Sequence, residues 1–483
     1  MEDFDLYTIA AKSVKGVFSL VSRTFFVQVL GIVSQLIIAA YLDTASFGVF
    51  FVVSSIVVFL TYFQDIGLAA SLIQKKEEPT IHELRSTFTM QQLLIICLLV
   101  PALIFSPQIA GFYHLNTAGY YLYLSLLFSF FLSSFRTIPT IILERRLEFS
   151  KLVLPEIVEM LCYNSALIIF AVLGYGITTF TIAVIVRSVV GLIVLYRVQS
   201  WDIGIEFDFK SLKELISFGL PFQANTVLAL IKDNLLTLYL GKVLPLSQVG
   251  YIGFAEKWAY VPLRLVMDNV IKVTFPSYSR LQHDKKALRV VVEKSLFLIA
   301  AVIFPFVVGI MMLSPFFIEF IPKYHKWEPA LLSLFLFSIN AAFASITVPI
   351  TNFLNAIGKV RLTLYFMIAW TIMIWGGTIM AIKVYGYNGV ALVSCLVAIS
   401  TLLVLIPARK YVKFSFFRPI YKQIIAVIGM AIFIFVIKSM ISSMLLLFVV
   451  AAIAGIVYFI ILGLLAKKEI KLLTAFIRQS LRQ

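Results

Sequence analysis

The sequence predicts an all-α polytopic membrane protein, and three observations lead to this class. Of its 483 residues, 61% are hydrophobic and only 13% are charged, and the mean hydropathy is +1.00. Such a chain has too little polar surface to cover a water-soluble globule. Its apolar residues also fall into stretches of about 20, the length that a helix needs to cross a bilayer. The third observation is the uneven distribution of basic residues between these stretches.

Fourteen stretches are long and apolar enough to be predicted as transmembrane helices. They are centred near residues 30, 60, 98, 130, 162, 188, 227, 262, 305, 341, 371, 397, 430 and 454. Because fourteen is even, both termini are expected on the same side of the membrane.

The basic residues of the connecting segments predict which side that is. The connections on the side of the termini hold 28 Lys and Arg, whereas the opposite connections hold five, and the remaining seven of the 40 lie within spans. Cytoplasmic loops carry the excess of Lys and Arg, so both termini are predicted to be cytoplasmic. The chain is therefore expected in a bacterial or archaeal cytoplasmic membrane, and its net charge of +16 reflects topology rather than nucleic-acid binding.

The chain repeats itself after a little over 200 residues. The segment "DTASFGVFF" (43–51) resembles "PLSQVGYIGF" (245–254), and "GYGITT" (174–179) resembles "GYNGVA" (386–391). Six helices separate the two copies, so both have the same orientation. This pattern predicts two parallel six-helix lobes around a central cleft, as in many alternating-access transporters.

The repeat also predicts the domain boundaries. Residues 1–208 form an N-terminal lobe with helices 1–6, and residues 209–410 form a C-terminal lobe with helices 7–12. Residues 411–466 hold helices 13 and 14, which lie outside the repeat. Residues 467–483, "KKEIKLLTAFIRQSLRQ", are predicted to form an amphipathic helix on the cytoplasmic leaflet.

The sequence holds no recognisable catalytic constellation. The segment "HELR" (82–85) lacks the second His of a zinc-protease helix, and the four His are scattered over separate loops. The three Cys lie inside apolar runs, which favours ordinary packing over a disulfide framework. No enzyme activity, cofactor or metal site is therefore expected.

The residues that carry chemical information are the charges inside the predicted spans. A charge at mid-bilayer costs about 2.5–3.5 kcal/mol, so such residues normally face a wet cavity or a partner. The basic ones are Arg23, Arg136, Arg187, Lys232, Lys257, Arg264 and Lys272, and the acidic ones are Asp65, Glu156, Glu159, Asp233, Glu256 and Asp268.

Several of these charges have candidate partners at the same depth. Asp65 lies level with Arg23, and Asp233 lies level with Lys257, so each pair is either a structural ion pair or part of a substrate or coupling site. Arg187 follows a helix with Glu156 and Glu159, which favours a structural pairing. Arg136 either lines the cleft or extends towards the cytoplasmic face. When Glu156, Glu159 and Arg187 are left out of the count, six basic and four acidic residues remain within the spans. This excess of positive charge suits an anionic substrate better than a cationic one.

The segment "EKWAYVPLRLVMDNVIK" (256–272) has the densest charge. On a helix, steps of 7, 11 and 15 residues return to within about 60° of one azimuth, so its charges form a polar stripe. The stripe consists of Lys257, Arg264, Asp268 and Lys272. Asp268 can neutralise only one of its two basic neighbours. Pro262 is expected to bend this helix.

A family resemblance rests on a series of segments between about residues 10 and 410. They include "AAKSVKGVFSLVSRTFFVQ", "AAYLDTASFGVF", "DIGLAASLIQKK", "ERRLEFSKL", "LISFGLPFQANTVLALIKDNLLTLYLGKVLPLSQVGYIGFAEKWAYVPLRL", "FPSYSRLQHD", "KWEPA" and "NAIGKVRL". In this order and spacing they resemble the polysaccharide transporter family, with its Wzx-type, colanic-acid and teichuronic-acid exporters, within the multidrug/oligosaccharidyl-lipid/polysaccharide superfamily. One departure is Tyr41, where many relatives carry Arg.

The resemblance implies a flippase that moves an isoprenoid-diphosphate-linked oligosaccharide from the inner to the outer leaflet for surface polysaccharide biosynthesis. Polymerase and glycosyltransferases of the same pathway are its expected partners. The residues expected to line the diphosphate and sugar cleft are Arg264, Lys257, Lys272, Asp268, Lys232, Arg23 and Arg136, with Asp65 and Asp233 as ion-pair or coupling residues. The prenyl tail is expected to stay in lipid, along helices 13 and 14.

Two other functions stay open. A lipid II flippase also has fourteen helices and a cationic lumen, so charge alone does not exclude it. A drug/cation antiporter of the same superfamily would need surplus carboxylates, and the charge count favours the opposite.

Overall fold

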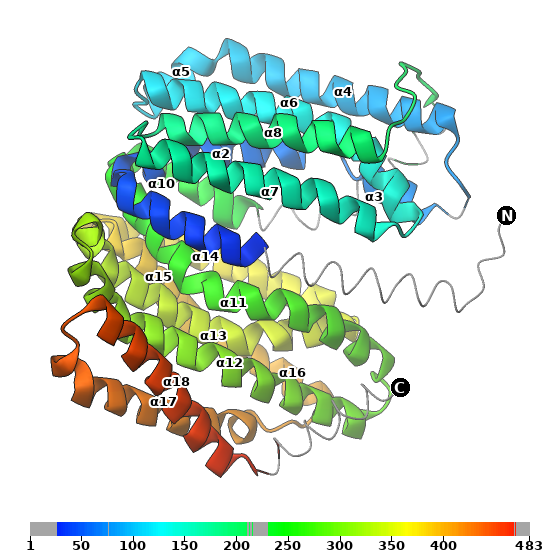
Figure 1. The fold of residues 1–483 in the computed structure, drawn as a ribbon. Coiled ribbons are helices and arrows are strands. Elements are labelled where there is room, and N and C mark those ends of the chain that lie inside the picture. Colours follow the sequence, from blue (N-terminus) through cyan, green and yellow to red (C-terminus); the bar gives the residue numbers. More distant parts are fainter. Residues whose placement is uncertain are drawn as a thin grey trace. The chain divides into compact units, whose positions relative to one another are not determined.

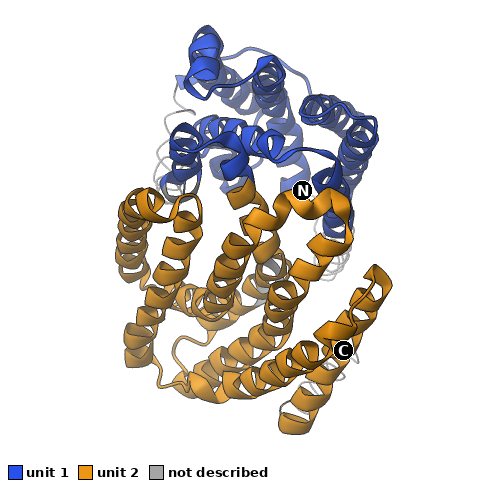
Figure 2. Ribbon diagram, turned by 90° about the vertical axis from the view of Figure 1, so that its left-hand side faces the viewer, with its two compact units in different colours: residues 1–250 blue, residues 251–483 orange. Residues whose placement is uncertain are grey.

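The structure, a computed structural model, describes residues 27–75, 77–209, 212, 215, 230–467 and 469, with the backbone alone at residues 232, 233, 268, 269 and 273. The part of the chain that it describes is built from helices and their connections (Figure 1). The predicted all-α polytopic class is confirmed in these residues. Two compact units divide the chain at Gly250 and Tyr251 (Figure 2).

Unit 1 begins, in the described residues, with the apolar helix Val27–Tyr41. The further elements are α2 (Thr44–Tyr62), α3 (Leu68–Gln74), α4 (Ile81–Ile104), α5 (Ser106–Phe112), α6 (Thr117–Arg145), α7 (Phe149–Val172), α8 (Thr178–Val198), the π-helix η1 (Ile231–Leu235) and α10 (Leu236–Val243). Helix α8 packs against both α6 and α7, and α6 also contacts α2 and α4.

Unit 2 begins at Tyr251, within the long helix α11 (Leu246–Arg280). The further elements are α12 (Lys285–Phe320), η2 (Pro322–Ala330), α13 (Leu331–Ala356), α14 (Val360–Tyr385), α15 (Asn388–Ser400), η3 (Thr401–Val404), α16 (Leu405–Tyr411), α17 (Phe417–Ile437), η4 (Lys438–Met440) and α18 (Met444–Leu465). Helix α12 packs against α13 and α17, and α17 packs against α18.

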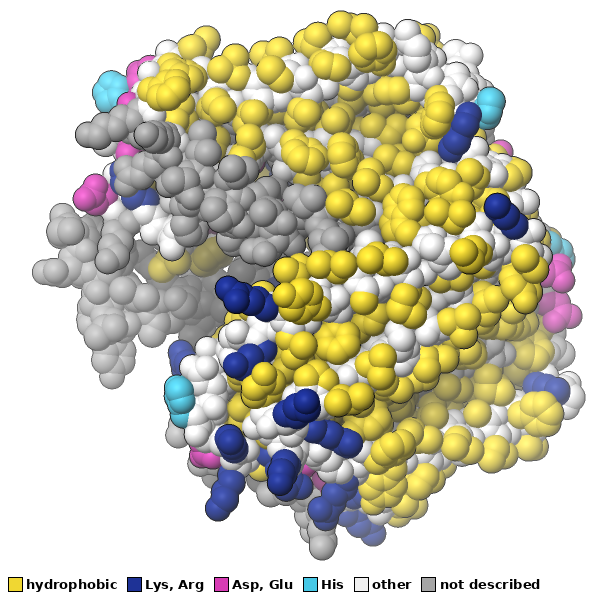
Figure 3. Space-filling model, turned by 180° about the vertical axis from the view of Figure 1, so that it is seen from behind, with side chains coloured by type: hydrophobic (Ala, Val, Ile, Leu, Met, Phe, Trp, Pro, Cys, Tyr) yellow, Lys and Arg dark blue, Asp and Glu magenta, His cyan; other side chains and the backbone are white. Residues whose placement is uncertain are grey.

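Eleven of the described helices, or helices with a short 3₁₀ continuation, are long and apolar enough to cross a membrane. Three of the fourteen predicted spans are not among them. The span near residue 30 is described only from Val27, most of the span near residue 227 lies outside the described residues, and the polar residues of α11 make it too hydrophilic for this group. Hydrophobic side chains cover most of the face drawn in Figure 3, as a membrane-embedded surface requires.

Short polar side chains begin several of these helices. Asp43 accepts a hydrogen bond from the Ser46 amide at 2.9 Å before α2, and Asn116 accepts one from the Gly119 amide at 2.8 Å before α6. Thr80 and Glu83 cap each other's backbone amides before α4. These caps satisfy amide groups that have no partner within the helix, which stabilises each helix start by about 1 kcal/mol.

The second predicted span is interrupted near Asp65. Helix α2 ends at Tyr62 and α3 starts at Leu68, so Asp65 lies in the break and not inside a helix as the sequence pattern predicts. Its carboxylate accepts a hydrogen bond from the Ala69 amide at 3.0 Å. Ile66 and Gly67, directly before α3, have φ values of 48° and 78°, a left-handed conformation that an α-helix cannot continue through.

Two glycines allow a close backbone contact within unit 1. A Cβ atom on Gly48 would lie 1.7 Å from the carbonyl oxygen of Leu246, and one on Gly250 would lie 2.0 Å from the carbonyl oxygen of Thr44. The first turns of α2 and α11 therefore touch through their backbones. Gly48 and Gly250 occupy equivalent places in the two repeated segments, as do Thr44 and Leu246, so the contact is reciprocal.

Candidate functional site

Helix α11 carries the predicted polar stripe. The helix is continuous from Leu246 to Arg280, so the spacing that defines the stripe is preserved. Arg264 and Lys272 are exposed and Lys257 is half-buried, whereas the side chain of Asp268 lies outside the described residues. Neither Arg264 nor Lys272 forms an ion pair with a described side chain. Their charge is therefore not neutralised by any described carboxylate.

A face of α11 adjacent to the stripe packs into unit 2. Met267 is 5% exposed and belongs to a cluster with Ile299, Ile303 and Val307 of α12 and with Ala341 of α13. This packing fixes the rotation of α11 about its axis. The stripe consequently points away from the core of its own unit, as an apolar helix with one polar edge requires.

A polar chain of hydrogen bonds reaches from α11 into the neighbouring helices. The Tyr260 hydroxyl donates to Asn340 Oδ1 at 2.8 Å, and Asn340 Nδ2 donates to the Ser394 carbonyl at 2.6 Å. Buried polar groups of this kind are satisfied and hold side chains in one orientation. The chain links α11, α13 and α15 near the level of the stripe.

The remaining predicted site residues belong to unit 1 or lie outside the described residues. Arg136 is on α6, and Asp65 is in the break before α3, both in unit 1. Lys232 and Asp233 lie in η1, but their side chains are outside the described residues, as is the whole of Arg23. The predicted pairs Arg23–Asp65 and Lys257–Asp233 therefore stay predictions.

Three charges in unit 1 form a cluster around one buried carboxylate. The Glu159 carboxylate of α7 lies 2.7 Å from Arg136 Nη2 of α6 and 2.7 Å from Arg187 Nε of α8. The side chain of Glu159 is only 4% exposed, compared with 27% for Arg136 and 42% for Arg187. The Arg187 guanidinium also lies 5.5 Å from the ring centre of Tyr163. We call these three residues the Arg–Glu–Arg cluster.

The cluster joins three helices and keeps a net charge of +1. Gly191 of α8 makes room for it, because a Cβ atom there would lie 2.6 Å from Glu159 Oε2. Removal of one member of a buried ion pair typically costs about 3–5 kcal/mol.

The sequence predicted that Arg187 pairs with a glutamate of α7, but it did not predict that Arg136 shares Glu159 with it. The sequence held a signal for it, since Arg136 and Glu159 lie on consecutive helices at similar distances from the α6–α7 connection.

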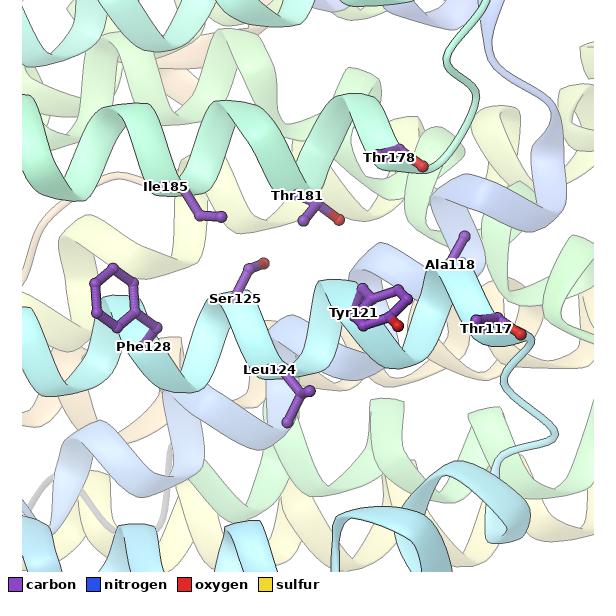
Figure 4. A pocket seen from close by; sticks show the side chains of 9 residues that line it. All are labelled: Thr117, Ala118, Tyr121, Leu124, Ser125, Phe128, Thr178, Thr181 and Ile185. Atoms are coloured by element: carbon purple, nitrogen blue, oxygen red, sulfur yellow. The ribbon is translucent and has the colours of Figure 1, made fainter.

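A separate cavity of about 620 Å³ opens between α6 and α8. Figure 4 shows Thr117 and Thr178 towards one end of this cavity and Phe128 and Ile185 towards the other. The lining holds no charged side chain. It therefore suits an apolar ligand better than a diphosphate.

The segment that follows α8 is clamped to the start of α4. Glu206 lies 2.8 Å from Arg85 Nη1 and 2.6 Å from His82 Nδ1, and its amide donates to the Thr89 hydroxyl at 3.1 Å. The Asp208 amide donates to the Ser86 hydroxyl at 2.9 Å. Hydrogen bonds from Arg85 and then His82 lower the pKa of the Glu206 carboxyl. We call this set of contacts, between residues 82–89 and 202–208, the linker clamp.

The many helices that are long and apolar enough to cross a membrane define the class as a polytopic membrane protein. The exposed basic residues of α11 favour contact with water or an anionic ligand. A family model described as "Polysaccharide biosynthesis protein" matches residues 37–332. The chain belongs to this polysaccharide biosynthesis family, and it is a transporter rather than an enzyme.

Curated relatives agree with the family. The lipopolysaccharide biosynthesis protein WzxC of Escherichia coli (strain K12) is 24% identical over 81% of this chain and 80% of its own length. The teichuronic acid biosynthesis protein TuaB of Bacillus subtilis (strain 168) is 23% identical over 64% of both chains. The predicted family resemblance is thus confirmed.

Solved structures show the same fold. The lipid II flippase MurJ in an inward closed conformation has a TM-score of 0.74 at 18% identity and covers 93% of this chain and 99% of its own. An inward-facing multidrug resistance MATE transporter has a TM-score of 0.62 at 17% identity and covers 80% and 95%. At these identities the likeness establishes the fold alone.

Proposed function

We propose that this transporter is a flippase that carries an isoprenoid-diphosphate-linked oligosaccharide from the inner to the outer leaflet. The observation that carries the proposal is the basic stripe of α11, where Arg264 and Lys272 have no described carboxylate partner. Unneutralised cations in a membrane-embedded helix require either water or an anionic ligand. The names of WzxC and TuaB support a glycan as the cargo.

The chemistry of such a substrate explains why the stripe is needed. A diphosphate is multiply anionic and its sugars are dense in hydroxyl groups, so unaided passage would leave these groups unsolvated in hydrocarbon. The two sequence repeats are proposed to form the lobes of an alternating-access carrier, with fourteen spans and a wet cleft between the repeats. The prenyl chain would stay in lipid along helices α17 and α18.

Arg264 is the proposed centre of the substrate site. It lies about 27 Å along α11 from Leu246, near the middle of this 35-residue helix. A guanidinium binds phosphate through two parallel donors, whereas an ammonium offers one compact charge. Lys257 and Lys272 would bind the diphosphate as it enters and leaves, and Asp268 would neutralise one of them. Lys232, Arg23 and Arg136 are proposed to add positive charge, with Asp65 and Asp233 as pairing or coupling groups.

The test is complementation of a flippase-deficient strain, with surface polysaccharide as the readout. Arg264→Ala should abolish export at normal protein levels, and Arg264→Lys should retain part of it. Arg280→Ala is the matched control, because it removes the same side chain from the exposed end of the same helix. Full export by Arg264→Ala would remove this residue from the site.

The proposed substrate can be separated from lipid II by the same approach. Export of the glycan without rescue of a strain that lacks its lipid II flippase supports the oligosaccharide substrate. Rescue of that strain, without glycan export, would favour the alternative. The MurJ-like fold alone does not distinguish the two.

The proposed orientation places both termini in the cytoplasm of a bacterial or archaeal cell. A cysteine that replaces Lys326 should react with an impermeant thiol reagent from outside, whereas one that replaces Lys285 should react only after permeabilisation. External labelling at position 285 would invert the topology.

A further inference from the structure

One end of unit 2 is strongly basic. This end consists of the α11–α12, α13–α14 and α16–α17 connections and of the residues that follow α18. Thirteen Lys and Arg of the described chain lie at this end, against three carboxylates, Asp284, Glu293 and Glu469. The basic residues are Arg280, Lys285, Lys286, Arg289, Lys294, Lys359, Arg361, Arg409, Lys410, Lys413, Arg418, Lys422 and Lys467. We call this surface the basic end.

Packing gathers these connections into one surface. A single core cluster contains residues from the ends of five helices and from the segment 412–416, among them Tyr278, Leu288, Leu354 and Ala408. The end of α18 is tied to the same region by the ion pair of Lys422 with Glu469 at 2.6 Å. The basic residues are therefore neighbours in space, and Figure 3 shows Lys and Arg side chains gathered towards one edge of the face it draws.

The carboxylates at this end do not neutralise it. Glu293 pairs with Arg289 at 2.9 Å and also accepts the Ser415 amide at 2.7 Å, so it holds the segment before α17 in place. Asp284 caps α12 through two backbone amides. All the basic residues of this end except Lys422 are exposed. A net charge of +10, thirteen minus three, thus remains on the surface.

Local helix stability does not account for this charge. Helices α12, α14 and α17 begin at the basic end, and their first turns contain Lys285, Lys286, Arg361 and Arg418 but no Asp or Glu. Cations are unfavourable at the amino end of a helix, where the backbone dipole is already positive. These positions therefore weaken their own helices and favour an anionic ligand outside the chain.

Exposed aromatic side chains accompany the cations. Phe417 is 68% exposed, Tyr421 is 43% exposed and Tyr411 is 36% exposed, and the Lys359 ammonium lies 5.0 Å from the Tyr411 ring centre. Tyr411 is the last residue of α16, and Phe417 and Tyr421 lie in the first turns of α17, one of the eleven helices that could span a membrane. Aromatic rings next to basic groups at the end of a span are typical of the level of lipid headgroups. The ligand should therefore combine an anionic group with an apolar part.

We propose that the basic end binds anionic phospholipid headgroups, with Lys413 and Arg418 as contact residues beside Phe417. This site goes beyond the proposed transport function and does not depend on it. The complementary charge and the adjoining apolar surface of α17 favour a phospholipid of the surrounding leaflet over a soluble anion. The bound lipid would hold together the three connections that repel one another in its absence.

The test measures lipid retention by the intact, detergent-purified protein with native mass spectrometry. Phosphatidylglycerol should bind at least tenfold more tightly than phosphatidylcholine at low salt. Lys413→Gln together with Arg418→Gln should weaken the binding of phosphatidylglycerol about 25-fold, because each charge contributes about fivefold. The matched control is Lys383→Gln together with Lys438→Gln, which removes two exposed charges from the opposite ends of α14 and α17 and should change nothing.

The design separates this role from topology and from folding. The test pair leaves 26 of the 28 basic residues on its side of the membrane, so the orientation is unchanged. The exchange Lys413→Arg with Arg418→Lys keeps the charge and should retain lipid binding. Equal binding of the two phospholipids, or equal loss in test and control pairs, would overturn the proposal. Displacement of phosphatidylglycerol by inorganic phosphate would show a soluble-anion site. Its displacement by an isoprenoid phosphate at a lower concentration than that of phosphatidylglycerol would show a substrate-loading site. Either result would also overturn the proposal.

Discussion

The contact of Gly48 with Gly250 predicts that a single methyl group will destabilise unit 1. In Gly48→Ala, the new Cβ would lie 1.7 Å from the Leu246 carbonyl oxygen and 2.6 Å from its carbonyl carbon. Both atoms belong to the backbone, so no side chain can rotate out of the way. The first turns of α2 and α11 must therefore separate.

The size of the effect follows from the geometry. An ordinary contact of a Cβ atom needs about 3.4 Å or more, so the two backbones must move apart by more than 1 Å. Overpacking of this kind costs about 1–3 kcal/mol and occasionally more. Gly250→Ala should cost a similar amount, because its Cβ would lie 2.0 Å from the Thr44 carbonyl oxygen. The double variant should cost less than the sum of the two, because one separation relieves both clashes.

The assay is the thermal unfolding midpoint of the purified protein in detergent, followed by size-exclusion chromatography. Gly31→Ala is the matched control, since it lies on the helix Val27–Tyr41 and a Cβ atom there would meet nothing within 4 Å. Alanine there should leave the midpoint unchanged or raise it slightly. A midpoint for Gly48→Ala equal to that of the control, or strict additivity in the double variant, would refute the close contact.

Two further predictions concern the charges of unit 1. Glu159→Gln should lower the thermal midpoint, because it leaves two arginines of the Arg–Glu–Arg cluster without their shared carboxylate; the cost should stay below the value of about 3–5 kcal/mol for a fully buried pair, since both arginines are partly exposed. Glu148→Gln, which removes a half-buried carboxylate paired with Lys151, is the control, and equal midpoints would contradict a structural role. The lowered pKa of Glu206 means that its stabilisation of the linker clamp is present above the usual carboxyl value of 4.5 and is lost as the pH falls through the lowered value. Proteolysis of residues 199–209, measured across this range with an acid-active protease, should therefore accelerate in acid, and Glu206→Gln should show rapid cleavage at every pH; a rate for that variant like the parent's would contradict the clamp.

The class of the fold could be predicted because hydropathy acts over whole segments. Eleven of the fourteen predicted spans are present as suitable helices, and a single break near Asp65 was missed. That break depends on the left-handed backbone at Ile66 and Gly67, and an apolar segment with one glycine gives little warning of it. Helix periodicity was enough to place the stripe of α11, because the helix continues unbroken through Pro262.

Contacts between helices were less accessible to sequence reasoning. The Arg–Glu–Arg cluster depends on how α8 packs against α6 and α7, and Gly191 leaves the room that the Glu159 carboxylate occupies. The linker clamp joins Arg85 to Glu206 across 121 residues, and no local pattern marks such a pair. The role of the stripe in substrate binding stays a prediction, because it concerns a ligand rather than the packing of the chain.

The linker clamp has a consequence for biosynthesis. Residues 82–89 leave the ribosome more than a hundred residues before Glu206 and Asp208. The polar side chains at the start of α4 therefore lack these partners until α8 and the segment after it have been made. Domains of a large protein generally fold in the order of their synthesis. The clamp can therefore close only after α8 and residues 199–208 have been made. The clamp therefore sets the earliest point in translation at which this end of the first half can be closed.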